Sequence, residues 1–166
     1  REDGGFGYTG PAVSELTGVG ILSHQLMGQP GVPEVKGGLA HLMGTDRFRW
    51  PGATWKNVYY WYYNTQARFH EGGECWKSWQ AQFAKPMIQA QVVEPQVAKA
   101  AGGRPVDIGY WDTGNERGGR VMDTTLCALT LEVYYRYLPT FQKVVEPAVD
   151  TAAGKSAEDL NIRVQL

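Results

Sequence analysis

The sequence predicts an all-α fold in which about three helical hairpins form an inner and an outer layer, with glycine-rich loops between the helices. Apolar residues recur at three- and four-residue steps in successive segments, and clusters of glycine and proline separate these segments. Segments that are apolar on nearly every face alternate with amphipathic ones, as expected when each inner helix is covered by an outer helix. A two-layer ring of helices explains this alternation, and a plain helical bundle is the alternative.

The first hairpin is expected within residues 14–43. Its inner helix runs from Ser14 to Met27, after which Gly28 suits the left-handed C-terminal cap. Its outer helix runs from Glu34 to Met43, directly after Pro33, a residue favoured at the start of helices. The apolar stripe of this outer helix consists of Val35, Leu39, Leu42 and Met43.

The second hairpin starts with a helix from Trp55 to His70, for which Thr54 is the N-cap and Gly72 and Gly73 are the terminator. Aromatic side chains on nearly every face predict that this helix is buried on all sides. The next helix is amphipathic and contains Pro86, which is expected to kink it. Its single apolar stripe consists of Trp76, Trp79, Phe83, Met87 and Ala90.

The third hairpin follows a long loop. Residues 94–119 are predicted to be a loop rich in glycine and proline. The next inner helix is expected from Arg120 to Leu138, and a further helix from Thr140 to Ala153. Residues 1–154 then form one partial-ring domain, and residues 155–166 form an extended C-terminal tail.

The composition excludes some classes of function. Of the 166 residues, 43% are hydrophobic, and 16 Lys and Arg balance 17 Asp and Glu, so a basic surface for nucleic acid is not expected. No apolar run reaches the ~18 residues of a membrane span. The two cysteines are too few for a disulfide framework. The missing initiator methionine is compatible with a cleaved leader or a trimmed chain, and we expect a periplasmic or secreted protein.

Four sequence blocks occur in the order found in the prenyltransferase and squalene-oxidase repeat proteins. They read DGGFGY at 3–8, YYWYYxTQ at 59–66, GGxxWxxW at 72–79 and GRVxxTTxxALxLEVYYRY at 119–137. Over residues 3–140 the chain therefore resembles this branch of the terpenoid cyclase and protein prenyltransferase superfamily, in particular its uncharacterised bacterial members. The resemblance implies a partial α/α toroid that a partner protein or further repeats complete.

The acid motif that the resemblance leads one to expect is incomplete. Cyclases of this superfamily protonate an alkene with the central aspartate of a D-x-D-D-T-A motif, whose neighbouring carboxylates keep it protonated and acidic. Residues 120–125 of this chain read R-V-M-D-T-T, so methionine stands at the proton-donor position. Asp123 remains as a catalytic candidate. The alternative is a structural role in the first helical turn, where a carboxylate favours the positive end of the helix dipole.

A zinc site of the prenyltransferase type would need Asp, Cys and His ligands. The D-x-C pair of that family is absent, but Asp123 and Cys127 lie four residues apart on one helical face and are candidate ligands. A histidine would have to supply a third ligand. The alternative is that Cys127, like Cys75, is a small buried residue, and we predict no cofactor.

Aromatic and acidic residues suggest two further sites. The predicted ligand-binding residues either line a lumen that holds an isoprenoid or a sugar, or fill the core of a closed ring; they are Tyr59, Tyr62, Tyr63, Gln66 and Trp111. Close to Trp111, the loop carboxylates of Asp107, Asp112 and Glu116 could supply an acid and a base for glycan chemistry. Polar loop residues that cap helices are the alternative, and Asp112 is the catalytic candidate among them.

The sequence thus predicts a non-catalytic toroid-type module that binds or scaffolds, because neither the acid motif nor the zinc motif is intact. A part of a ring leaves apolar surface uncovered, so we expect a protein partner or the remaining repeats to cover it, with an apolar or glycan ligand as a further binding partner. The alternative is an isoprenoid- or glycan-acting enzyme that uses a nonstandard acid.

Overall fold

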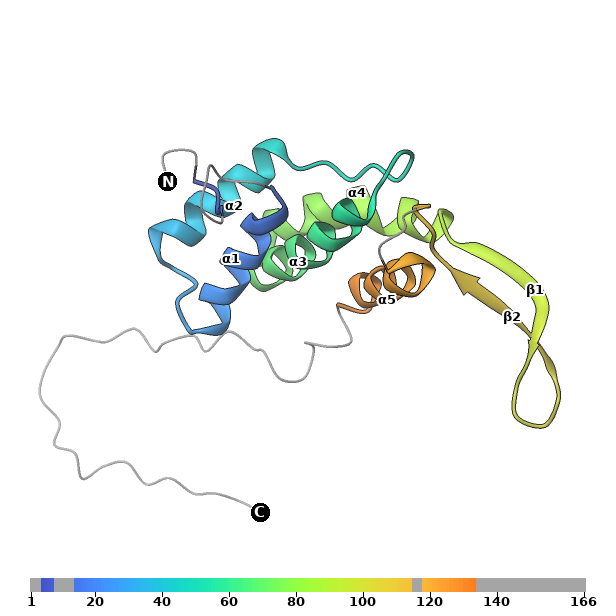
Figure 1. Cartoon of the computed structure of the whole chain (residues 1–166). Helices are drawn as coiled ribbons and strands as arrows, with labels where there is room; N and C mark the ends of the chain where they lie inside the picture. The colour runs from blue at the N-terminus through green and yellow to red at the C-terminus, as the bar shows by residue number, and fades with distance from the viewer. Residues whose placement is uncertain (1–3, 8–13, 115–117, 134–166) are drawn as a thin grey trace, which may run out of the picture.

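The computed structural model describes residues 4–7, 14–114 and 118–133, and the fold of these residues is mostly helical (Figure 1). In chain order, its elements are α1 (Ser14–Leu26), α2 (Pro33–Thr45), α3 (Trp55–Glu71), α4 (Gly73–Gln89), β1 (Val92–Lys99), β2 (Pro105–Tyr110) and α5 (Gly119–Leu131). The helices predicted over 14–27, 34–43 and 55–70 are therefore confirmed, with bounds that differ by at most two residues, whereas α5 begins within one residue of its predicted start but ends at Leu131 and not at Leu138.

Part of the predicted organisation falls beyond the residues that the structure describes. This applies to the helix over 140–153, to the tail over 155–166 and to the helix over 120–138 after Val133. Glu116 also lies outside the described residues. Among the helices of the described ranges, none combines the length and the hydropathy that crossing a bilayer requires.

Residues 92–110 form a β-hairpin, so the prediction of an all-α fold and that of a loop over 94–119 are wrong here. β1 pairs antiparallel with β2, with Val92 opposite Tyr110 and Ala98 opposite Val106. The β-branched residues of both segments favour strands. Proline and glycine inside the same segments obscured this preference, because both residues disfavour regular strands. The pairing of the two strands contains a β-bulge next to Pro95.

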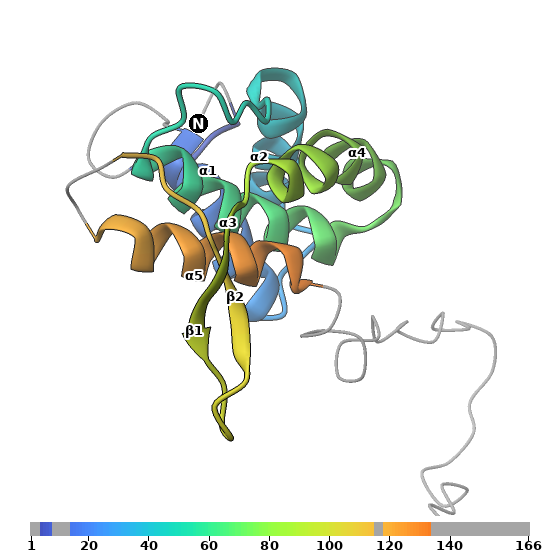
Figure 2. The same ribbon diagram turned by 90° about the vertical axis from the view of Figure 1, so that its right-hand side faces the viewer.

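The helices pack in two layers. α1, α3 and α5 lie side by side with α3 in the middle, while α2 packs against α1 and α4 packs against α3 (Figure 1, Figure 2). Both views also show the β1–β2 hairpin projecting away from the helices. In the described part of the chain, the first two helices of the row are thus each covered by the helix that follows them.

Two apolar clusters hold these layers together. The larger one joins α3, α4 and α5 to the residue after β2, and its buried members are Val58, Trp61, Trp76, Trp79, Phe83, Met87, Trp111, Cys127 and Val133. The smaller one joins α1 and α2 to α3 and α4 through Ile21, Leu22, Val35, Leu39, Leu42, Ala67 and Cys75. The predicted stripes are therefore confirmed, except that Met43 is 44% exposed and Ala90 is half-buried beyond the end of α4.

The burial of α3 differs from the prediction. Trp61 is 1% exposed, as expected, but all four tyrosines of this helix are only half-buried. The neighbouring helices cover the Trp61 side of α3 and leave part of its circumference accessible. The predicted ends are confirmed, since the Thr54 N–H donates to Asn57 Oδ1 at 2.8 Å and Gly72 follows the helix with a φ of 74°.

α1 and α3 approach each other closely at Gly18. A Cβ atom at this position would overlap the side-chain oxygen and the backbone of Asn64. The absence of a side chain at Gly18 thus sets how near the two helices lie, and it places the polar atoms of Asn64 between them.

Candidate functional site

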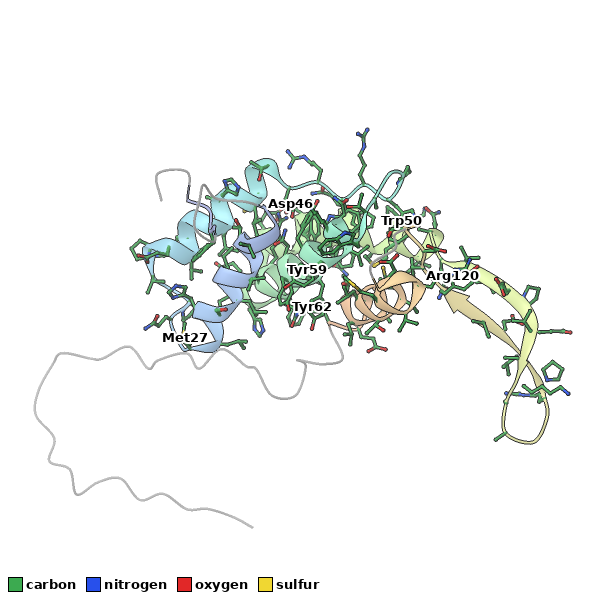
Figure 3. The ribbon with its side chains drawn as sticks, viewed as in Figure 1. Met27, Asp46, Trp50, Tyr59, Tyr62 and Arg120 are labelled. Carbon is green, nitrogen blue, oxygen red and sulfur yellow. The ribbon has the colours of Figure 1, made fainter. Side chains whose placement is uncertain are left out.

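Three tyrosines gather on one face of α3 and form the candidate ligand-binding surface, which we call the tyrosine face. Tyr59, Tyr62 and Tyr63 are three or four residues apart or adjacent, so their rings lie within one sector of the helix. The ring centroids of Tyr59 and Tyr63 are 5.0 Å apart, and those of Tyr62 and Tyr63 are also 5.0 Å apart, with an edge-on angle of 76°. In Figure 3 the labelled Tyr59 and Tyr62 lie on α3 between α1 and α5.

The phenol group of Tyr63 is neutral. Burial raises the pKa of Tyr63 to about 12, and a hydrogen bond with Tyr59 acts in the same direction. Tyr63 therefore carries no charge at neutral pH and is no general base. The tyrosine face offers aromatic edges and hydroxyl groups, which suit an apolar chain, a sugar or a protein side chain.

The structure places the other two predicted ligand-binding residues in the interior. Gln66 is 4% exposed and Trp111 is 5% exposed. The Trp111 Nε1–H donates to the Met87 carbonyl at 2.7 Å, and its backbone N–H donates to Thr124 Oγ1 at 3.1 Å. Trp111 thus joins the end of β2 to α4 and α5, in a different apolar cluster from the one that Tyr63 contacts.

Asp123 anchors the segment that follows the hairpin. Its side chain is fully buried, and Oδ2 accepts hydrogen bonds from the Thr113 N–H at 2.7 Å and from Thr113 Oγ1 at 2.8 Å. The carboxylate therefore satisfies two donors of one residue, and this accounts for a fully buried aspartate in α5.

Cys127, the other predicted zinc ligand, is held as a neutral thiol. It is fully buried, and burial raises its pKa to about 12, with a further rise caused by the nearby charge of Asp123. A cysteine binds zinc as its thiolate. Within the described ranges, no three His, Cys, Asp or Glu side chains gather closely enough to hold a metal ion.

Asp112 lies at the surface and is paired with Arg120. Its Oδ2 accepts from Arg120 Nε at 2.7 Å, and its Oδ1 accepts from the Gly114 N–H at 2.8 Å. The hydrogen bond from Arg120 is the main cause that lowers the pKa of this carboxyl, so Asp112 is poorly suited to donate a proton. Asp107 lies apart in the hairpin, where it accepts the Gln96 N–H at 3.0 Å.

Asp112 also lines a small pocket. The pocket has a volume of about 180 Å³ and is lined by Trp50, Pro51, Gly52, Ala53, Asp112 and Thr113. Hydrolysis of a glycoside needs a second carboxyl group ~5–10 Å from the first. Asp112 supplies the one carboxyl group among these lining residues.

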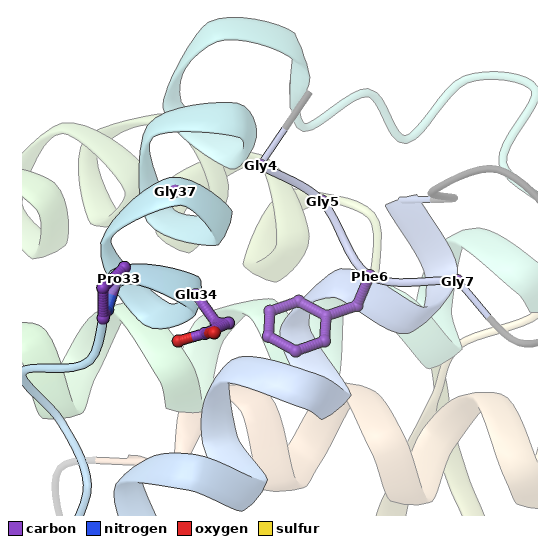
Figure 4. A pocket seen from close by; sticks show the side chains of 7 residues that line it. All are labelled: Gly4, Gly5, Phe6, Gly7, Pro33, Glu34 and Gly37. Carbon is purple, nitrogen blue, oxygen red and sulfur yellow. The ribbon is translucent and has the colours of Figure 1, made fainter. Parts of the chain in front are cut away.

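A larger pocket of about 360 Å³ lies where the glycine-rich segment passes the start of α2 (Figure 4). Its walls consist mostly of backbone, and its lining residues are Gly4, Gly5, Phe6, Gly7, Pro33, Glu34 and Gly37. The backbones of Gly4 and Gly37 touch, so a Cβ atom at Gly4 would overlap the Gly37 carbonyl. The Phe6 N–H donates to Thr17 Oγ1 at 3.1 Å and fixes this segment on α1.

Sequence reasoning missed a buried polar cluster between α2, α3 and α4. Asp46 follows α2, and its Oδ2 accepts from Asn64 Nδ2 at 2.9 Å and from the Arg68 guanidinium at 3.2 Å. The Arg68 guanidinium also stacks on the Trp79 ring, 4.5 Å from its centroid. Trp79 in turn donates its Nε1–H to Thr65 Oγ1 at 2.8 Å.

The charged pair of this cluster is almost completely buried. The side chains of Asp46 and Arg68 are 1% and 2% exposed. Burial raises the pKa of the Asp46 carboxyl, and the charge of Arg68 opposes this rise. One signal in the sequence pointed to the cluster, because Asn64 and Arg68 are four residues apart on the same side of α3 as the buried Trp61.

Comparisons with models of known protein families, with curated proteins and with solved structures find no match for this chain. The resemblance to prenyltransferase-like repeat proteins therefore stays a prediction, and the function has to be argued from the described residues themselves.

Proposed function

We propose that this chain is a non-catalytic binding or scaffold module of the partial α/α-toroid type, which a partner chain or further repeats complete. The observation that carries the proposal is the tyrosine face. Tyr59, Tyr62 and Tyr63 present half-buried rings on the middle helix of the α1–α3–α5 row. In a ring built of such rows, the tyrosine face would line the central lumen. Aromatic walls suit apolar or sugar ligands.

The absence of catalysis is supported by what the candidate reactive groups already do. Asp123 accepts two hydrogen bonds from Thr113, Cys127 is a buried thiol with a pKa raised to about 12, and Asp112 is paired with Arg120. A general acid or a nucleophile needs a pKa near the working pH and access to the substrate. Each of these groups has a structural role instead.

The need for a completing chain is supported by apolar side chains at the ends of the row. Leu26 and Met27 at the end of α1 are 57% and 64% exposed, and Val121 in the first turn of α5 is 78% exposed. Single apolar side chains at a surface are ordinary. These side chains, however, lie on α1 and α5, the two helices at the ends of the row. Further helices that continued the row would cover them.

The test combines binding and turnover measurements on the full chain. Farnesol and a cello-oligosaccharide serve as apolar and glycan probes, and quenching of the intrinsic fluorescence reports binding. We expect saturable binding of one probe, weakened at least ~10-fold by Tyr59→Ser, which corresponds to ~1.4 kcal/mol of binding free energy. Tyr110→Ser, a half-buried tyrosine of the hairpin, is the matched control and leaves binding unchanged.

Turnover is measured with farnesyl diphosphate, squalene and the same oligosaccharide. We expect no product. Turnover that disappears in Asp123→Asn or in Asp112→Asn would replace this proposal by the enzyme alternative. A lack of saturable binding of both probes would reject the tyrosine face as a ligand site.

A further inference from the structure

We propose that the small pocket between the α2–α3 connection and the segment after β2 binds a neutral pyranose sugar, with the Trp50 indole against the ring and the Asp112 carboxylate on its hydroxyl groups. It binds the sugar without hydrolysing it, because a single carboxyl group lines the pocket. The inference does not rest on the tyrosine face. In Figure 3 the labelled Trp50 and Arg120 lie toward the base of the hairpin, apart from Tyr59 and Tyr62.

The volume of the pocket fits one six-membered ring. It measures about 180 Å³, and a cavity of ~150 Å³ is enough to hold benzene. Pockets for drug-sized ligands have volumes of ~300–1,000 Å³. The size of the pocket therefore favours one small ring over a long isoprenoid chain.

A tight turn fixes the apolar wall of the pocket. The Ala53 N–H donates to the Trp50 carbonyl at 2.8 Å, and Gly52 has a φ of 79°, as in a type II turn with Pro51 at its second position. The Trp50 ring also packs on Trp61, with centroids 6.4 Å apart and an interplanar angle of 30°. Trp61 is 1% exposed, whereas Trp50 is half-buried, so the indole is held from inside and keeps an accessible part for a ligand.

The carboxylate of Asp112 is held in place on the facing segment. Its Oδ2 accepts from Arg120 Nε at 2.7 Å, and its Oδ1 accepts from the Gly114 N–H at 2.8 Å. The Arg120 guanidinium in turn lies over the Tyr110 ring, 4.6 Å from its centroid. A carboxylate has about four lone pairs, so each oxygen can accept one further hydrogen bond. The Asp112 side chain is 29% exposed, which leaves it within reach of a ligand.

The charges at the pocket select a neutral ligand with hydroxyl groups. Arg120 already pairs with Asp112, so a cation would gain little from the carboxylate, and an anion would be repelled by it. A hydroxyl group that donates to a carboxylate forms a charge-assisted bond, which is stronger than a bond between neutral groups. A pyranose with equatorial hydroxyl groups matches both walls, because its ring C–H groups can face the indole while its edge reaches Asp112.

Titration of the full chain with methyl β-D-glucopyranoside, followed by saturation-transfer NMR of the glycoside, tests the proposal. We expect saturable binding with a dissociation constant on the order of 1–10 mM, as for other ligands of this size. Trp50→Ala removes the apolar wall and should raise this constant at least ~10-fold. Asp112→Asn keeps the shape of the side chain but removes its charge, and should raise the constant at least ~3-fold.

Two matched controls lie outside the pocket. Trp55→Ala changes a half-buried tryptophan, and Asp107→Asn changes an exposed carboxylate of the hairpin; neither residue lines the pocket. Both variants should bind the glycoside within ~2-fold of the wild type. Circular dichroism confirms that each variant keeps its helices. If Trp50→Ala does not fold, the surface variant Asp112→Asn decides.

Three results would overturn the proposal. The first is a wild-type chain that shows no saturation below ~50 mM glycoside. The second is binding of cyclohexanol, a ring of the same size with one hydroxyl group, as tight as that of the glycoside. The third is a loss of binding in Tyr59→Ser as large as in Trp50→Ala, which would place the sugar on the tyrosine face and so support the proposed function instead.

Discussion

Breaking the buried pair of Asp46 and Arg68 should be among the most destabilising changes in this chain. The two side chains are 1% and 2% exposed, and the Arg68 nitrogen lies 3.2 Å from Asp46 Oδ2. Removing one partner of such a pair costs about 3–5 kcal/mol, because the other charge stays buried without compensation. Domains have a total unfolding free energy of about 5–15 kcal/mol. With a urea dependence of about 2 kcal/mol/M, the unfolding midpoint of Asp46→Ala should fall by about 2 M.

The two single variants should respond differently to pH. In Arg68→Met the remaining group is a carboxyl, whose pKa burial raises and which has lost the cation that opposed the rise. A folded-state pKa above the unfolded value of about 3.9 means that stability is greatest at low pH and is lost as the pH rises through the folded-state pKa. The cost of Arg68→Met should therefore be smaller at pH 5 than at pH 8. The stability of Asp46→Ala itself should not change with pH at this site, because the titrating carboxyl is gone and a guanidinium does not lose its proton in this range.

Urea unfolding followed by circular dichroism at 222 nm, at pH 5 and at pH 8, measures both effects against the wild type. Arg49→Met is the matched control, since Arg49 lies exposed in the same connection between α2 and α3, and its cost should stay within about 0.5 kcal/mol. A cost of Arg68→Met below ~1 kcal/mol at pH 8, or a cost that is equal at both pH values, would refute the reasoning.

Three further predictions concern single residues. Gly18→Ala should lower the free energy of unfolding by about 1–3 kcal/mol, because the added methyl group overlaps Asn64. Gly44→Ala in α2 is the control and should raise it by up to ~1 kcal/mol, because the space around Gly44 is open and alanine favours helices. Thermal unfolding compares the two variants. Cys127 should resist iodoacetamide at pH 8.5 in the folded chain and react in urea, as mass spectrometry of the peptides reports, and equal rates would contradict its burial. Tyr63→Phe should remove the phase near pH 12 from an absorbance titration at 295 nm, and an unchanged phase would assign it elsewhere.

Local patterns predicted the helices well. Apolar residues at helical spacing, Pro33 at the start of α2 and the Thr54 cap of α3 act within one or two turns, so they can be recognised without knowledge of the fold. The tyrosine face follows from the same periodicity, because Tyr59 and Tyr63 are one turn apart on any α-helix.

The hairpin could not be predicted in this way. Its stability depends on pairs such as Val92 with Tyr110, which lie 18 positions apart in the chain. Within each strand, Pro95 and Gly109 argue against regular structure. A strand is defined by its partner, and the partner of β1 is not visible from the residues of β1.

The amino-acid sequence by itself determined where α1, α2 and α3 begin and end to within two residues, and that the acid and zinc motifs are incomplete, because each of these depends on neighbours within a few residues. Only the tertiary structure decided the roles of the polar groups. Asp46 meets Arg68 across 22 positions, and Thr113 reaches Asp123 across 10. Whether a carboxylate is a catalyst or an anchor depends on the donors that packing brings to it and on how much water packing removes.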